Sequence, residues 1–111
     1  MIVKESRIKT RSGAGALSRH VLHGAQNEVI RVLAGSDWLM RDHMREAKRD
    51  GLTYGLRHIA FNPAHAMSDA QLAEFAGRLC QELKADPSHM TLIIHQKDGL
   101  THGHLILPEW Q

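Results

Sequence analysis

The chain has a single cysteine, Cys80, and no hydrophobic run of the length that a membrane span requires. One cysteine cannot form an internal disulfide, which excludes the disulfide-rich secreted class and favours a reducing compartment. The N-terminus also lacks the apolar core of a secretory signal. We therefore expect a soluble, cytoplasmic protein. Its 111 residues are enough for one modest hydrophobic core, so residues 1–111 should form a single domain.

Net charge is also low, at +2, but it is unevenly distributed. Residues 1–24 have a local charge of +4, because Glu5 is the one acidic residue beside five basic ones: Lys4, Arg7, Lys9, Arg11 and Arg19. The rest of the chain therefore has a net charge of −2. A basic segment suits a polyanion such as nucleic acid, so these five are candidate DNA-binding residues. A solvated basic tail explains the same charges equally well.

Hydrophobic patterning predicts an α+β fold. Strands are expected at residues 1–4, 28–33, 54–61, 90–96 and 101–107, helices at 14–22, 37–50 and 68–83, and a basic loop at 5–15. The order β-α-β-α-β-α-β-β, closed by an antiparallel hairpin, predicts a mainly antiparallel sheet with the helices on one face. Ser68 and Gln71 form a capping box for the last helix, whose buried stripe includes Cys80. Trp38 and the methionines of the middle helix are expected in the core.

The segment MTLIIHQKDGLTHGHLIL near the end of the chain contains three histidines that a tight turn brings together. Asp98-Gly99 favours a two-residue turn with positive φ at both positions. That register places His95 opposite His102, and side-chain alternation puts His104 on the same face, diagonal to His95. Three neutral imidazoles form a metal site with an open coordination position, which suits catalysis. A histidine-rich surface strand without an ion is the structural alternative.

The hairpin has one histidine, then six intervening residues, then His-x-His, and apolar strands flank this pattern. The pattern resembles the histidine-triad motif of relaxases, the mobilisation nucleases of the HUH endonuclease superfamily. LSRHVLHGAQNEVIRVL (residues 17–33) resembles the N-terminal motif of mobilisation relaxases, and YGLRHIAFNP (54–63) resembles the strand and Asn-Pro turn that precede their long helix. The resemblance spans most of the chain in the right order. It implies an α+β HUH fold, an RRM-like palm whose open sheet centre carries the triad. Because relaxase domains generally continue past the triad, it also implies a member of the family that is either naturally short or truncated at its C-terminus.

The resemblance further implies a metal-dependent, site- and strand-specific DNA relaxase acting in conjugative transfer or mobilisation. Such an enzyme nicks and transfers one strand through a covalent 5′-phosphoprotein intermediate. His95, His102 and His104 would hold a divalent metal, Mn or Mg first, with Zn, Ni or Co as alternatives. The implied partner is single-stranded DNA at an origin of transfer, together with accessory mobilisation or coupling proteins.

Most relaxases use a tyrosine near the N-terminus as nucleophile, but the only tyrosine here is Tyr54. Some mobilisation relaxases use a histidine instead, and LSRH places His20 at the matching position, with His23 one turn later. A neutral imidazole carries a nucleophilic nitrogen at pH 7 without needing a strong base. Glu28, in the Asn-Glu pair of that motif, is the second candidate catalytic residue and would hold the imidazole in one tautomer. The structural alternatives are a helix-terminal histidine and a surface carboxylate.

Three other functions stay open. A rolling-circle replication initiator shares the histidine pair, but such proteins usually carry their tyrosine after the triad, where LILPEWQ has none. A single-stranded DNA-binding module that keeps the fold and metal without cleaving fits the short chain. A small histidine-rich metal-binding protein fits the histidines alone. In each case His58, at mid-strand, is expected to pack or support the site rather than act as a fourth ligand.

Overall fold

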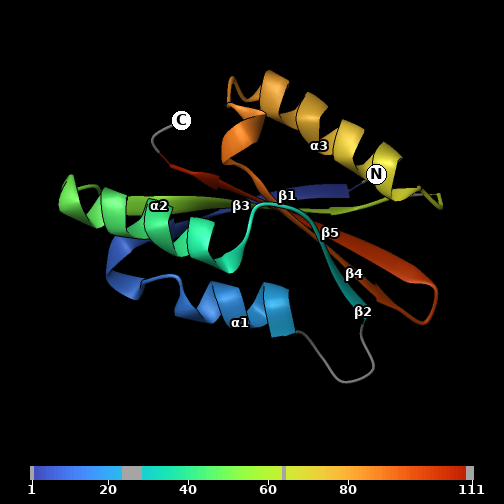
Figure 1. Ribbon diagram of the computed structural model, residues 1–111, viewed down its shortest axis with the longest axis horizontal. Helices are drawn as coiled ribbons and strands as arrows, with labels where there is room; N and C mark the ends of the chain where they lie inside the picture. Colours follow the sequence, from blue (N-terminus) through green and yellow to red (C-terminus); the bar gives the residue numbers. More distant parts are fainter. Residues whose placement is uncertain (1, 24–28, 64, 110–111) are drawn as a thin grey trace.

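The computed structural model describes residues 2–23, 29–63 and 65–109 (Figure 1). Its strands and helices are β1 (Ile2–Lys9), α1 (Gly15–His23), β2 (Val29–Ala34), α2 (Asp37–Arg49), β3 (Tyr54–Asn62), α3 (Asp69–Glu82), β4 (Thr91–Lys97) and β5 (Leu100–Pro108). Two short 3₁₀ turns, η1 (Thr10–Ser12) and η2 (Pro87–His89), precede α1 and β4. No helix in the described part of the chain combines the length and hydrophobicity needed to cross a membrane.

The five strands form one sheet in the order β1-β3-β5-β4-β2, and every neighbouring pair is antiparallel. The expected α+β class with an antiparallel sheet is therefore confirmed. The C-terminal hairpin lies in the middle of this sheet, with β5 as the central strand. Residues 103–106 of β5 consequently pair with both β3 and β4.

The helices cover both faces of the sheet, so the prediction that they share one face is wrong. Helices α1 and α2 pack on one face, here called the α1/α2 face, and α3 packs on the other, the α3 face (Figure 1). The reason lies in β4, where Leu92 and Ile94 pack with α3 while Ile93 packs with α1 and α2, all three with no exposed surface. A strand that is apolar on both sides needs cover on both sides.

Local signals at the helix starts behave as predicted. Ser68 accepts a hydrogen bond from the Gln71 backbone at 3.2 Å, and the Gln71 side chain accepts from the Ser68 backbone at 2.9 Å. The predicted capping box is therefore confirmed. The Ser36 hydroxyl caps α2 by accepting from the Leu39 backbone at 3.0 Å. Cys80 is fully buried on α3, as expected.

Two sequence-based expectations fail because pairing and packing differ from the local pattern. Residues 5–9 are strand rather than loop, because β1 pairs with β3 along its whole length. This strand tolerates polar side chains since it lies at the edge of the sheet. Trp38 is 65% exposed and is not a core residue, while Met40 and Met44 of the same helix are buried as predicted.

Candidate functional site

The hairpin register that the sequence predicts is confirmed. Asp98 and Gly99 form the turn with φ values of 52° and 77°, and His95 pairs directly with His102. His104 pairs with Ile93, which packs with α1 and α2, so all three hairpin histidines lie on the α1/α2 face. The ring centroids of His95 and His104 are 4.5 Å apart.

His102 is the exposed member of the three, and β3 fixes its orientation. Its Nδ1 lies 2.6 Å from the amide oxygen of Asn62, an atom that can only accept a hydrogen bond. Nδ1 therefore donates, and Nε2 carries the lone pair that a metal needs. From the sequence, Asn62 was identified only as part of an Asn-Pro turn. Its role beside His102 depends on the pairing of β3 with β5, which no local pattern predicts.

The other two hairpin histidines are buried, with exposed fractions of 5% for His95 and 7% for His104. The Nε2 of His95 donates to the carbonyl oxygen of Val21 in α1. The Nδ1 of His104 lies 2.8 Å from Nε2 of His58 on β3, which makes a hydrogen bond between the two imidazoles. His58 therefore contacts a hairpin histidine directly.

Helix α1 adds a fourth ring to this group. His20 is exposed, and its ring centroid lies 5.5 Å from that of His104, 6.3 Å from His58 and 6.4 Å from His95. We call His20, His58, His95 and His104 the histidine cluster. Residues from three separate parts of the chain thus meet at one place, although only the hairpin could be derived from local sequence.

The two competing nucleophile candidates lie elsewhere. His23 is close enough to α2 to help lower the pKa of the Asp37 carboxyl, after the larger effects of the Ser18 hydroxyl and Arg41. Tyr54 opens β3 four residues before His58, which is about 13 Å at the usual rise of a strand. Its ring lies 3.8 Å below the guanidinium of Arg7. His20 is therefore the candidate that the fold brings to the cluster.

The second catalytic candidate, Glu28, lies outside the described residues. The five candidate DNA-binding residues do not form one patch. Lys4 is exposed on β1 and faces the α1/α2 side, since it pairs with Ala60, which pairs with His104. Arg7 pairs with Glu109, and its guanidinium lies over the ring of Tyr54. Lys9 ends β1 and Arg11 lies in η1. Arg19 is exposed on α1, next to His20 in the chain.

Burial lowers the pKa of two cluster histidines. Loss of solvent is the largest cause, followed by the charges of neighbouring imidazoles, and it brings the pKa of His104 to about 3 and that of His58 to about 4. Both rings are therefore neutral at pH 7, the form that binds a metal. Of the three expected ligands, His104 therefore has the protonation state that a divalent ion needs. Among the described residues, however, no three His, Cys, Asp or Glu side chains converge closely enough to hold one.

The low pKa values predict that the metal-free protein loses stability in acid. The unfolded histidines, with a pKa near ~6.5, bind protons that His58 does not bind in the folded state until about pH 4 and His104 until about pH 3. The free energy of unfolding should therefore fall on the order of 2–4 kcal/mol as the pH is lowered from about 6.5 to about 4. Urea denaturation with EDTA at a series of pH values measures this. The His58→Gln variant, which can keep the hydrogen bond to His104, should show a shallower decline. An equally steep decline in that variant would contradict the assignment.

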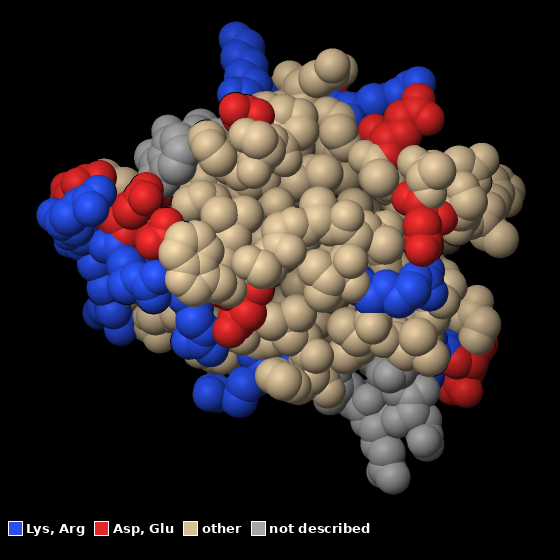
Figure 2. All heavy atoms as spheres, viewed as in Figure 1, with Lys and Arg blue, Asp and Glu red and all other residues tan. Residues whose placement is uncertain are grey.

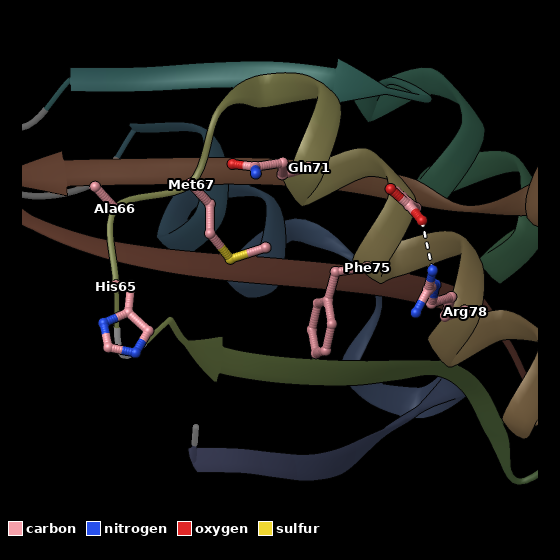
Figure 3. Close-up of a pocket in the computed structure, with 7 residues that line it drawn as sticks. His65, Ala66, Met67, Gln71, Phe75 and Arg78 are labelled. Carbon is pink, nitrogen blue, oxygen red and sulfur yellow. Dashed lines mark hydrogen bonds and ion pairs between the residues drawn. The ribbon is translucent and has the colours of Figure 1, made fainter.

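The α3 face has a hollow of its own. A cavity of about 390 Å³ is lined by residues of α3 and of the loop before it (Figure 3). Met67 and Phe75 reach from the α3 side towards the sheet, and the ion pair of Arg78 and Glu74, 2.6 Å apart, lies at one end. None of the cluster histidines lines this cavity. A different groove, of about 410 Å³, adjoins His102 and Asn62 at the hairpin tip.

Comparison of the chain with protein-family models, with curated protein sequences and with solved structures finds no significant match. What the chain does has to be inferred from its own residues and their geometry.

Proposed function

We propose that the chain is a metal-dependent relaxase with an HUH-like fold, which nicks one DNA strand at an origin of transfer and becomes linked to the 5′ phosphate. The observation that supports this most is the position of His20. Helix α1 sets this exposed imidazole 5.5 Å from His104, centroid to centroid, on the sheet face that also presents His102 and Asn62. The candidate nucleophile and the candidate metal ligands therefore lie on the same face of the sheet, as the proposal requires.

In the proposed reaction, a nitrogen of the neutral His20 ring attacks the phosphorus of the scissile phosphodiester. A phosphorus–nitrogen bond forms and the bond to the 3′ oxygen breaks, with that oxygen taking up a proton as it leaves. The imidazole loses its remaining N–H proton to solvent, so the charges balance. The phosphoramidate keeps most of the bond energy of the diester, so the 3′ hydroxyl can later attack it and reseal the strand.

His95, His102 and His104 would hold the divalent ion, Mn or Mg first, with Zn, Ni or Co as alternatives. When bound, the ion supplies a positive charge next to a non-bridging phosphate oxygen, where negative charge builds up. Asn62 orients His102, and the hydrogen bond from β3 fixes the ring of His104. His95 would have to turn away from the Val21 carbonyl to offer its Nε2.

The need for His95 to turn away from Val21 favours one competing function, a single-stranded DNA-binding module that does not cleave. In the described residues the candidate ligands do not converge on one point, and His95 is held by α1. Such a module would use the same face of the sheet and need no ion. The two functions differ in whether a covalent product forms.

The proposal predicts a covalent adduct with DNA from the protein's own genetic neighbourhood. A pool of 3′-labelled single-stranded oligonucleotides that tile the DNA flanking its gene is incubated with the protein and manganese, then resolved on a denaturing gel. We expect the 3′ label to move to the mass of the protein, because the 5′ phosphate of the downstream fragment stays attached. EDTA should abolish the shift. Binding without any adduct would favour the non-cleaving module, and an adduct formed in EDTA would contradict the role of the metal.

A further inference from the structure

One side of α2 carries an exposed aromatic residue in line with three exposed cations. Trp38, Arg41, Arg45 and Lys48 follow at intervals of three or four residues, so they share a side of the helix, here called the α2 stripe. Trp38 is 65% exposed, so much of its ring surface is open to a ligand.

The cations of the α2 stripe line a groove rather than an open surface. Arg41, Arg45 and Lys48 form one wall of a cavity of about 270 Å³, and residues 13–15 form the other. A second groove of about 470 Å³ shares Gly13 with the first and adds Arg7 and Lys9. No acidic side chain appears among the described residues that line either groove. Figure 2 shows Lys and Arg side chains at the left of the molecule, over the C-terminal half of α2 and the turn before α1, with Asp and Glu side chains among them.

These cations are available to an anionic ligand. Arg41 pairs with Asp37 at 2.9 Å and Arg45 with Asp42 at 3.3 Å, both on the surface, where such pairs contribute about 1 kcal/mol or less. A phosphate can therefore replace either carboxylate at small cost. Lys48 makes no ion pair with any residue in the described ranges.

We propose that the α2 stripe and its groove bind single-stranded nucleic acid, with a base stacked on Trp38 and the backbone phosphates on Arg41, Arg45 and Lys48. Aromatic stacking combined with a cationic groove is the general solution for unpaired strands, whose bases are free to leave the stack. A duplex would not present its bases to Trp38. The stripe extends about 15 Å along the helix, longer than one nucleotide, so a polymer fits it better than a single phosphate.

The Trp38 end of the stripe lies at the contact between α2 and α1, the helix that carries His20. Ser18 of α1 donates a hydrogen bond to Asp37 of α2 at 2.6 Å, so the first turn of α2 is held against α1 two residues before His20. A strand with its scissile phosphate at His20 would reach Trp38 first and the cations after it. This direction of the strand rests on the proposed function, whereas binding by the stripe does not.

The test measures binding with EDTA present, so that nicking plays no part. Fluorescence anisotropy of a labelled oligothymidylate of ~20 nucleotides is followed from about 50 to 200 mM KCl. Three variants are compared: Trp38→Ala, the groove pair Arg45→Gln with Lys48→Gln, and a matched pair on the α3 side, Arg78→Gln with Lys84→Gln. The two pairs remove the same net charge, so a difference between them reports the place and not the charge.

We expect Trp38→Ala to weaken binding about tenfold and Trp38→Phe, which keeps a stacking ring, to retain it within about threefold. The groove pair should reduce the slope of log affinity against log salt concentration by about 1.4, while the matched pair leaves the slope unchanged. Equal slopes for both pairs, full affinity in Trp38→Ala, or a duplex that binds as tightly as the single strand would each overturn the inference. So would thymidine monophosphate that competes as well as the oligonucleotide at equal phosphate concentration. Binding by the stripe without any adduct would leave this inference standing and count against the nuclease alone.

Discussion

Replacing His20 with alanine is expected to lower the yield of the covalent DNA adduct by about a thousandfold or more, because the variant lacks the atom that bonds to phosphorus. His20 is the one candidate nucleophile that belongs to the histidine cluster, and its ring centroid lies 5.5 Å from that of His104. The measurement is the fraction of 3′-labelled oligonucleotide that comigrates with the protein in manganese after denaturation.

His23 provides the matched control, since it is a second exposed histidine one turn further along α1. The His23→Ala variant should retain adduct formation within about threefold of the unmodified chain, as expected for a group outside the reacting set. An adduct that persists in His20→Ala would remove His20 from the mechanism. If it disappeared in His23→Ala alone, the two histidines would have to exchange roles.

Gly103→Ala is expected to lower the free energy of unfolding by about 3 kcal/mol, which is a large part of the stability of a small domain. A Cβ at this position would overlap the ring of Phe61. That ring cannot move aside easily, because it is 1% exposed and packs against Phe75 with a centroid distance of 4.9 Å. Gly103 also separates His102 from His104, so any shift of β5 moves both imidazoles.

Gly77→Ala is the control for that substitution. Gly77 lies inside α3, and an added Cβ there meets no atom within 4 Å. Alanine should therefore stabilise the helix by about 0.5–1 kcal/mol. Urea denaturation of both variants measures the difference. A Gly103→Ala variant within about 1 kcal/mol of the unmodified chain would show that Phe61 can adapt.

The sequence predicted the parts of the candidate site that depend on neighbours in the chain. The Asp98-Gly99 turn determines its own geometry, so the pairing of His95 with His102 followed directly from it. The helix caps at Ser36 and Ser68 were equally local. The placement of His20 beside the cluster was expected only from the resemblance to relaxases, because it depends on how α1 packs on the sheet.

Features that depend on tertiary contacts were missed or wrong. The contacts of His58 with His104 and of Asn62 with His102 require β3 to lie next to β5, which residue patterns do not encode. The sequence did contain a signal that helices cover both faces of the sheet. The apolar runs of β4 and β5 are unbroken, whereas a half-exposed strand alternates apolar and polar residues. Helical periodicity gave Trp38 a core position, but the buried side of α2 is formed by Met40 and its neighbours.

The two-residue turn at the hairpin tip has a consequence for which sequence changes this domain can accept. Adding or deleting one residue there would shift one strand of the hairpin by one position and carry every side chain of that strand to the opposite face of the sheet. His102 and His104 would then lie beneath α3, out of reach of His20, while Leu105 and Leu107 would lose their packing. Amino-acid replacements at the tip are therefore far easier to accommodate than a change in its length.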